Sequence, residues 1–409
     1  MKLFRRGKGL LADKKGNVLI VTAAVMPLLV GSAGLAIDTI QLSLLKRHLQ
    51  RAADSGALAG AYARAQSKPV SAAVNQALAF NDAFPLASPA TITEPNSGTY
   101  ANRAVRVRLA ATRSLPFWSF FRSAPTITVE AMAALVYTGK YCMVSLDESS
   151  ATGIRFSGNS TVNLGCGVIS NTSGSSAVVA EQSSTVTASP VAAVGNVPSS
   201  TSYVQPTLLL PYSLKQPDPF ASLPQPTAPS GCQPLTVNTN QDITPTTNCF
   251  NGLDVRGTLR LNPGTYYVTG GSFNLNAQSN IIGSGVTIVF TSPTPSVQSS
   301  YPTININGGA NINLTAPTSG TYAGVLMHYD ARKEGGDYFI NGNSGSTFEG
   351  AFYFPKQNLT FNGNSNMITN CIQLVAYRLT FTGNTKINNN CPTGGGARSF
   401  DASWVRLVA

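Results

Sequence analysis

The sequence contains few charged residues. Asp, Glu, Lys and Arg make up 11% of its 409 residues, whereas an average soluble domain carries about 25%. The formal net charge is nevertheless +11, and the excess is local: residues 1–64 contribute +7, residues 65–138 contribute +3 and residues 139–409 only +1. A nucleic-acid-binding domain needs a basic surface on its folded part. We therefore predict no nucleic-acid partner.

Several sequence motifs that are typical of metal sites and enzyme active sites are also missing. The chain has no Cys-x-x-Cys, paired histidines, phosphate loop, dinucleotide fingerprint or nucleophile elbow, so we predict no metal and no cofactor. One cluster could cleave a glycosidic bond with paired carboxylates and a base. It consists of His328, Asp330, Arg332, Lys333, Glu334 and Asp337. Because these residues crowd into one Gly-containing loop, we predict no catalytic residue, and a carbohydrate-active enzyme remains the alternative.

One long run without charge is present near the N-terminus, from Val18 to Ile37. At 1.5 Å per residue, twenty helical residues span a hydrocarbon core of about 30 Å, and a secretory signal core is shorter. We predict a retained single-pass anchor, with a cleaved signal peptide as the alternative. Six Lys or Arg residues precede the run and three follow it closely. This asymmetry predicts a cytoplasmic basic tail at residues 1–15 and an exported remainder.

The residues after the run continue a helical pattern. An apolar stripe recurs at steps of three and four residues, and no stop signal occurs before Ser67–Pro69. The stripe contains Leu42, Leu45, Leu49, Ala52, Gly56 and Ala59. Residues 16–66 are therefore predicted to form one long helix that leaves the membrane.

This segment resembles a known family. The shared features are a Gly-Asn pair, an apolar span, an Asp after the span and the run LQRAADSGALAGA. In this sequence they are Gly16, Asn17, Asp38, Leu49, Gln50, Ala52, Ala53, Asp54, Ala57, Leu58, Ala59, Gly60 and Ala61. The pattern, over about residues 14–65, is similar to that of TadE/TadG-like proteins of the tight-adherence (Flp) pilus-assembly system. The resemblance implies a single-pass bacterial inner-membrane protein whose partners are other pilus-assembly or envelope proteins.

Two departures limit what the resemblance implies. Type IV prepilins carry Glu five residues after their cleavage-site glycine, but the fifth residue after Gly16 is Val21. The chain is therefore not predicted to be a pilus subunit. Some relatives carry an Asp-x-Ser-x-Ser metal site, which neither Asp147 nor Asp401 completes.

Residues 67–138 read as a small α/β module. A short helix is expected near residues 71–82, and two strand-like segments follow at 103–121 and 125–137. Arg103, Arg106 and Arg108 lie on one expected strand, which we interpret as a solvated basic face.

Residues 139–409 contain an internal repeat. Its copies are FSGNSTVNLGC at 156–166, INGGANINL at 306–314, INGNSGSTFEG at 340–350, FNGNSNMITNC at 361–371 and FTGNTKINNNC at 381–391. Gly342, Gly363 and Gly383 are 21 and 20 residues apart. Short β-rich runs with Asn and Gly turns at this period predict a parallel β-helix, a solenoid of about 20 residues per coil. A proline-rich insertion is expected at about 190–250, because prolines lack the N–H donors that a coil needs.

The six cysteines suit an exported domain with three disulfides. Six cysteines allow 15 pairings, and the repeat selects among them. Cys371 and Cys391 each follow their repeat glycine by eight residues, so they are expected to be stacked and bonded at the open end of the solenoid. Cys166 has the same place in its repeat, and Cys142 lies one coil back. The predicted bonds are Cys142–Cys166, Cys232–Cys249 and Cys371–Cys391.

The sequence thus predicts a mainly β protein with a transmembrane helix, a small α/β module and a parallel β-helix. Its expected role is non-enzymatic scaffolding or surface binding in the cell envelope during pilus assembly, in the periplasm or outside the cell. A stand-alone adhesin that binds cell-surface polysaccharide is a further alternative.

Overall fold

The computed structural model describes residues 17–81, 85–120, 122–181, 183–342, 346–363, 366–389 and 400–408. The predicted basic tail at 1–15 lies outside these residues. The chain forms two compact units, Met1–Val136 with Val405–Ala409, and Tyr137–Trp404. Each unit is described below by itself.

The first unit begins with α2 (Asn17–Ala65), an uninterrupted helix of 49 residues that includes the predicted span. Pro27 does not end it, and the hydroxyls of Thr22 and Thr39 donate hydrogen bonds to carbonyl groups four residues earlier. Such internal bonds let polar side chains lie in an apolar helix. An 18-residue window has a mean hydropathy of 1.7 and is 11% buried, so the helix is long and apolar enough to cross a membrane.

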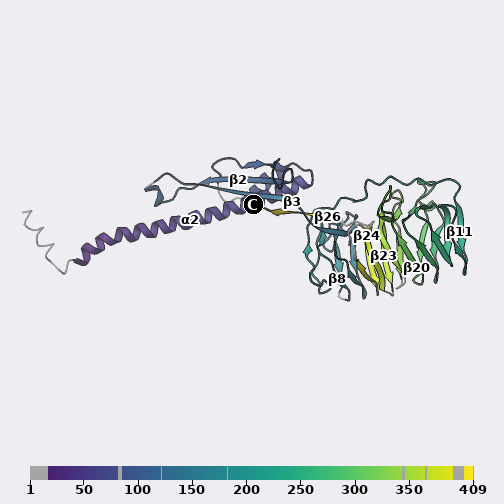
Figure 1. Ribbon diagram of the computed structural model, residues 1–409. Helices are drawn as coiled ribbons and strands as arrows, with labels where there is room; N and C mark the ends of the chain where they lie inside the picture. Colours follow the sequence, from purple (N-terminus) through teal and green to yellow (C-terminus); the bar gives the residue numbers. More distant parts are fainter. Residues whose placement is uncertain are drawn as a thin grey trace, which may run out of the picture. The chain divides into compact units, whose positions relative to one another are not determined.

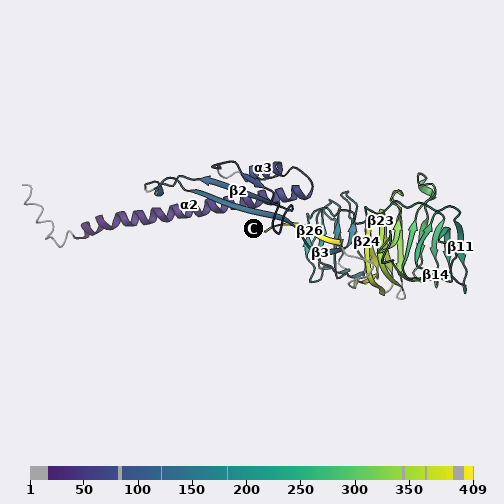
Figure 2. The ribbon, with the colours of Figure 1, turned by 45° about the horizontal axis from the view of Figure 1, so that its top comes forward.

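A helix and a hairpin complete the first unit. The elements are α3 (Val70–Phe80), β1 (Thr91–Thr93), β2 (Ala104–Thr112), η1 (Trp118–Phe120) and β3 (Thr126–Ser145). Strands β2 and β3 pair in antiparallel register, with Ala104 opposite Ala134 and Thr112 opposite Thr126. Figure 2 shows this hairpin lying along α2.

The second half of α2 packs against this hairpin through a ridge of small residues. Its buried residues recur every fourth position, at Leu45, Leu49, Ala53, Ala57 and Ala61. Of the predicted stripe, Leu45, Leu49 and Gly56 are buried. Its other members, Leu42, Ala52 and Ala59, are only half-buried, because the contact follows a straight i, i+4 ridge. A Cβ on Gly60 would lie 2.7 Å from Val105, so the helix approaches β2 closely only because this residue is glycine.

The second unit is built from short strands in one large sheet system. Apart from the end of β3, they are β4 (Ile154–Phe156), β5 (Thr161–Asn163), β6 (Gly167–Ser170), β7 (Val178–Ala180), β8 (Thr185–Thr187), β9 (Val191–Ala193), β10 (Leu209–Leu210), β11 (Gln233–Val237), β12 (Asp242–Ile243), β13 (Cys249–Val255), β14 (Thr258–Leu261), β15 (Gly264–Val268), β16 (Ser272–Leu275), β17 (Asn280–Gly283), β18 (Val286–Phe290), β19 (Thr303–Ile306), β20 (Asn311–Thr315), β21 (Val325–Tyr329), β22 (Asp337–Gly342), β23 (Thr347–Gly363), β24 (Asn366–Gly383), β25 (Lys386–Asn389) and β26 (Phe400–Leu407). The 3-10 turn η2 (Gln298–Ser300) interrupts them once.

These strands pair in parallel along three rows. In the first row, β9, β6, β3, β24, β23, β21, β18 and β15 are successive neighbours. A second row runs from β7 through β4, β24, β23, β22, β19, β16 and β13 to β11, and a third from β8 to β12. Side chains alternate along each strand, so every row sends one set of residues to a shared interior.

The interior shows that the repeat copies are stacked in register. Ile306, Ile340, Phe361, Phe381 and Phe156 form one column, each opposite the next. All five are buried, and the Phe381 ring stacks on Phe361 at 5.5 Å and on Phe156 at 5.1 Å between ring centroids. The glycine register follows, because Gly363 pairs with both Gly342 and Gly383.

The order of the repeats in space differs from their order in the sequence. The last strands of the repeat, β24 and β25, pair with β4 and β5 of the first copy. In Figure 1 the yellow strands β24 and β23 accordingly lie between β8 and the green strand β20. The expectation that the last repeat forms an open end is therefore wrong. The chain starts in the middle of the stack, reaches one end at β9 and β10, and resumes at the other end with β11.

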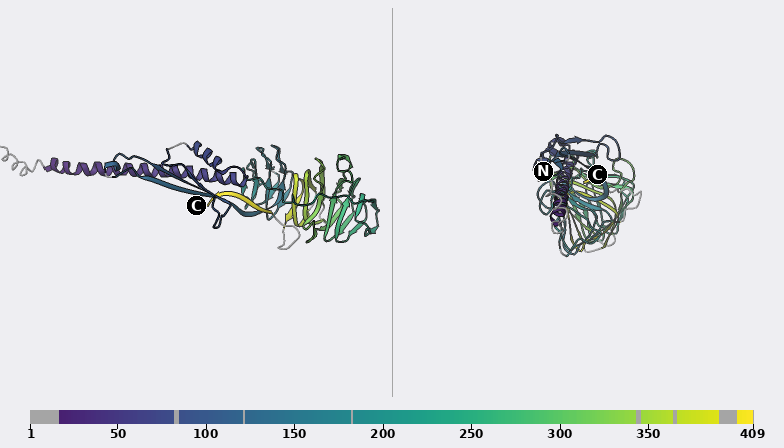
Figure 3. Two further views of the ribbon diagram at one scale, coloured as in Figure 1. Left: turned by 90° about the horizontal axis from the view of Figure 1, so that it is seen from above. Right: turned by 90° about the vertical axis from the view of Figure 1, so that its left-hand side faces the viewer.

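The segment between these two ends, residues 211–232, is here called the strap. It lies along the first row of strands: Ser213 N donates to Ala193 O at 2.7 Å, and Gln216 exchanges two hydrogen bonds with the Asn171 side chain. Because β9, β11 and β12 fall within residues 190–250, the predicted insertion is too long at both ends. Figure 3 shows the second unit from two further sides.

Candidate functional site

The strap covers an outward-facing row of apolar and aromatic side chains on the first row of strands. The row includes Tyr141, Val144, Ile169, Val289, Tyr322, Val325, Tyr353 and Val375, and Phe220 and Leu223 of the strap pack against it. Tyr353 is held twice: its hydroxyl donates to Asp218 at 2.8 Å, and its ring lies 5.2 Å from that of Phe220. The strap therefore buries a surface that would otherwise be an exposed apolar patch.

His328 of the predicted polar cluster lies in this covered row. Its side chain is 2% exposed and its ring lies between those of Tyr322 and Tyr353, at 5.6 and 5.1 Å. Burial lowers the pKa of His328 to about 4, against a weaker opposite effect of Asp330. A neutral imidazole enclosed by two tyrosines is part of the packed row.

Asp330 has a structural role in the same loop. It is fully buried and accepts hydrogen bonds from the Thr291 hydroxyl at 2.7 Å and from the Arg332 guanidinium at 2.6 to 3.1 Å. Burial alone would raise the pKa of Asp330, but the bonds from Arg332 and Thr291 outweigh it and lower this pKa. Arg332 also donates to the carbonyl oxygen of Pro226 in the strap. The pair thus joins the strap to β21.

The other members of the cluster point elsewhere. Lys333 is half-buried, whereas Glu334 and Asp337 are exposed. Glu334 lies 3.8 Å from Lys356, and Asp337 accepts from Asn358 at 2.8 Å. Among the residues that the structure describes, no group of three His, Cys, Asp or Glu side chains could hold a metal ion.

A cavity of about 600 Å³ lies under the far part of the strap. Its walls are formed by 224–227 of the strap and by residues such as Pro263, Tyr267, Ser319 and Tyr322. It has hydroxyl and backbone groups but no acidic or basic side chain in its lining. This composition suits binding of a neutral ligand better than acid–base chemistry.

A second ion pair, with a buried carboxylate and a half-buried arginine, joins the first and last repeats. Asp147, at the end of β3, accepts from Arg378 of β24 at 2.6 Å and from the backbone N–H and hydroxyl of Ser149. Burial acts to raise the pKa of Asp147, and the bonds from Ser149 and Arg378 lower it overall. The sequence gives no sign that Asp147 and Arg378 are in contact. They become neighbours only because the last repeat lies beside the first in the fold.

Among the described residues there are two disulfides, and both are predicted pairs: the repeat spacing predicts Cys142–Cys166, and Cys232–Cys249 is the pair left to close the proline-rich insertion. Cys142 is bonded to Cys166 with a Cα–Cα distance of 5.9 Å, and Cys232 to Cys249 with 5.0 Å. Cys391 lies outside the described residues, so the Cys371–Cys391 bond stays a prediction.

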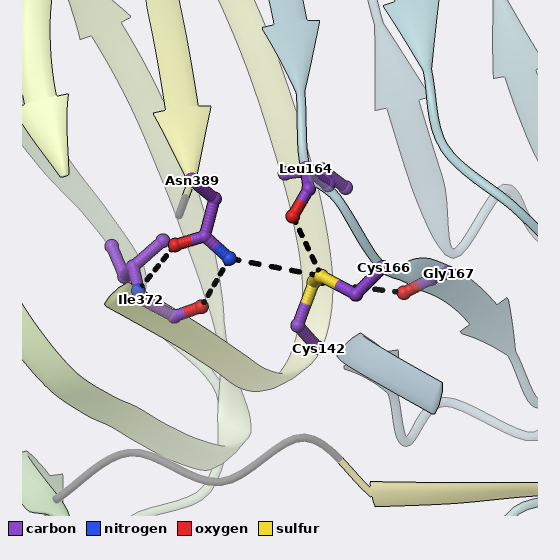
Figure 4. The surroundings of a disulfide bond; sticks show 6 residues. All are labelled: Cys142, Leu164, Cys166, Gly167, Ile372 and Asn389. Atoms are coloured by element: carbon purple, nitrogen blue, oxygen red, sulfur yellow. Dashed lines mark hydrogen bonds between the residues drawn. A yellow bond between two sulfur atoms is a disulfide. The ribbon is translucent and has the colours of Figure 1, made fainter. Parts of the chain in front are cut away.

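The surroundings of the first disulfide link it to the last repeat. Figure 4 shows the Asn389 side chain between Cys166 and the backbone of Ile372. Its Oδ1 accepts from Ile372 N at 2.7 Å, and its amide nitrogen donates to Ile372 O at 3.3 Å and contacts Cys166 Sγ at 3.7 Å. Asn389 thus fixes β24 and β25 beside the bonded pair.

The disulfides can be tested by peptide mapping under non-reducing conditions. Three linked peptide pairs are expected, including Cys371–Cys391. Replacing Cys142 with Ser should lower the free energy of unfolding by about 3 kcal/mol, because a loop of about 25 residues is released. A bond between Cys371 and Cys232 or Cys249 would contradict the repeat register.

Asp38 of the N-terminal segment forms a site within the first unit that the sequence did not reveal. Its side chain is 2% exposed, and its Oδ2 accepts from the backbone N–H groups of Phe117 and Trp118 at 3.0 and 2.7 Å. The two N–H groups belong to the turn that joins β2 to β3. The acidic residue after the span therefore holds the tip of the hairpin against α2.

The comparison with known families agrees with this segment. Residues 16–65 match a family model described as putative Flp pilus-assembly TadE/G-like. No curated protein and no solved structure matches the chain. The resemblance expected from the Gly-Asn pair, Asp38 and the AADSGALAGA run is thereby confirmed, and residues 16–65 are similar to the TadE/G-like proteins of Flp pilus assembly.

Proposed function

We propose that this chain is a non-enzymatic, membrane-anchored envelope protein of Flp pilus assembly that acts by scaffolding or surface binding. The observation that carries the proposal is the family match over 16–65, which coincides with α2. The half of α2 beyond the span packs against the α/β module of the same unit through the ridge from Leu45 to Ala61. The anchor and the α/β module of the first unit are thus one rigid element, which suits a protein that holds this module at a fixed distance from a membrane.

The proposed location is the bacterial inner membrane, with the N-terminus in the cytoplasm and the remainder exported. The basic residues before Val18 support this orientation, and the two disulfides suit an oxidising compartment. A periplasmic phosphatase fused after Lys140 should be active. Activity of a cytoplasmic reporter at the same site would contradict the orientation.

We further propose that the second unit is a parallel β-helix. Its support is the three rows of parallel pairs and the buried column from Ile306 to Phe156. Each repeat buries its neighbours' apolar side chains, so the unit provides a long, stiff surface. Exposed Phe339 beside Asn305 and Asn274 could bind a sugar ring, which keeps adhesion to polysaccharide as a second candidate.

The enzyme alternative receives less support from the same geometry. Asp330 is occupied by Arg332 and Thr291, and His328 is enclosed by tyrosines. Only Glu334 and Asp337 of the cluster are exposed carboxylates.

Piliation in living cells tests the function. Deletion of the gene should abolish Flp pili, and the wild-type gene should restore them. The double variant Glu334→Gln, Asp337→Asn should restore them equally, because both side chains are exposed and neither holds the fold together. Restored piliation by the wild type but not by this variant, together with loss of polysaccharide cleavage, would favour the enzyme. Normal piliation in the deletion strain would refute the pilus role.

A further inference from the structure

The turn between β2 and β3 carries an unusual concentration of aromatic residues. The aromatic loop, defined here as residues 115–120, has the sequence LPFWSF and contains η1. Leu115 is fully buried, Phe117 and Trp118 are half-buried, and Phe120 is 83% exposed. Within the first unit, nothing in the described residues covers Phe120. An exposed phenylalanine at a hairpin tip is unfavourable in water and indicates a contact with something apolar.

The level of this loop along α2 is fixed by two contacts. Asp38 binds the N–H groups of Phe117 and Trp118, and a Cβ on Gly34 would lie 2.2 Å from the Phe117 ring. The ring therefore lies directly on the helix backbone at Gly34, one turn before the apolar run ends at Ile37. Both contacts lie within the first unit, so they place the loop beside the end of the span.

We propose that the aromatic loop lies in the headgroup region of the membrane leaflet at which the span ends, with Trp118 and Phe120 in contact with lipid. This inference rests on the proposed membrane anchor. If Val18–Ile37 fills the hydrocarbon core, residues 34–38 lie at its boundary. Because the aromatic loop contacts Gly34 and Asp38, it lies at the same depth in the membrane. The occupant is the lipid of the membrane that holds α2, since the loop is continuous with the lipid-facing side of that helix.

The chemistry of the loop matches that location. Tryptophan is enriched at membrane–water interfaces because its ring is apolar and its indole N–H can remain hydrated. Arg122, which follows the loop, is exposed and basic, and such a side chain reaches anionic headgroups while its methylenes contact lipid. The hairpin would thus give the anchor a second point of contact and fix the tilt of α2 relative to the membrane.

Tryptophan fluorescence provides the test, because the chain has two tryptophans, Trp118 and Trp404. The full chain is reconstituted in vesicles of phosphatidylcholine and phosphatidylglycerol containing lipids brominated near the headgroup. Trp404→Phe leaves only Trp118 as a reporter, and Trp118→Phe leaves only Trp404, which packs within the second unit. We expect bromine quenching of Trp118 to be several-fold stronger than that of Trp404. Equal quenching of the two would overturn the proposal.

Two glycine substitutions in the Trp404→Phe background provide a matched pair. Gly34→Leu should displace the Phe117 ring and reduce the quenching of Trp118, whereas Gly31→Leu should leave it unchanged, because nothing lies within 4 Å of a Cβ there. Both changes keep the run apolar, so both variants should still insert. An equal effect of the two would overturn the placement of the loop.

Flotation of the vesicles separates this proposal from the anchor itself. Protein that floats with the vesicles but shows no stronger quenching of Trp118 retains the anchor and refutes the loop contact. Protein that does not float at all refutes the anchor, and the loop contact with it.

Discussion

Replacing Phe381 with Ala is expected to lower the free energy of unfolding of the second unit by about 3–5 kcal/mol. The side chain is fully buried between Phe361 and Phe156, with ring centroids 5.5 and 5.1 Å away. Its removal leaves a cavity where the last repeat meets the first, and both neighbouring rings lose stacking contacts. Denaturation of the detergent-solubilised chain, followed by circular dichroism, measures the effect.

Phe339→Ala provides the matched control. Phe339 lies on β22 in the same row of strands, but it is 47% exposed. Its loss should change the free energy of unfolding by about 0.5 kcal/mol or less. Similar effects of the two substitutions would mean that Phe381 is not between two repeats, and that the order of the repeats described here is wrong.

The second large effect concerns pH and His328. Its folded-state pKa of about 4 lies below the ordinary value of 6.5, so the unfolded chain takes up a proton first as pH falls. The contribution of neutral His328 to the free energy of unfolding is therefore fully present above pH 6.5. It is lost progressively as pH falls from 6.5 to 4. The full loss is about 3 kcal/mol, at 1.36 kcal/mol per pH unit. Denaturant unfolding measured between pH 4 and 6.5 should show this decrease as a slope of the free energy of unfolding against pH.

Two variants show whether His328 is the cause. His328→Phe keeps a ring between Tyr322 and Tyr353 and should flatten the slope between pH 6.5 and 4. Tyr322→Phe keeps the enclosed imidazole and should retain the slope, because burial raises the pKa of Tyr322 to about 12, far above this range. Below pH 4 both variants should still lose stability, because the lowered pKa values of Asp147 and Asp330 make their bonds fail there. An unchanged slope in His328→Phe would refute the assignment.

Much of the fold could be predicted from local pattern. The run from Val18 to Ile37 and the stripe after it indicate one long helix, because the run is long and apolar, the stripe has a helical period, and a single proline is tolerated in a membrane helix. Repeat glycines predict which positions are stacked, and Gly363 with Gly383 shows that they are. The same spacing gives the Cys142–Cys166 pair, since each cysteine has a fixed place in its repeat.

The order of the repeats could not be predicted in this way. Similar heads, FSGN from Phe156 and FTGN from Phe381, indicate that these residues occupy equivalent places, but equivalence does not say which repeats are adjacent. Adjacency depends on where the strap leads the chain, and a proline-rich segment carries no periodic signal. The contacts of Asp38 with Phe117 and Trp118 were hidden for a similar reason, because a buried carboxylate that binds backbone N–H groups leaves no side-chain partner to find.

The meeting of the first and last repeats sets the sequence of events when the protein is made. Phe156 is synthesised early, while Phe381, which covers its ring, is synthesised only after the strap and all repeats of the other half. Until then the newborn domain has an uncovered row of strand edges and an exposed aromatic core face, which are the features that promote aggregation. Closing this contact joins residues distant in sequence, so it is expected to be the slow step of folding. A cell that makes this chain must therefore keep the first half from self-association until the second half is synthesised.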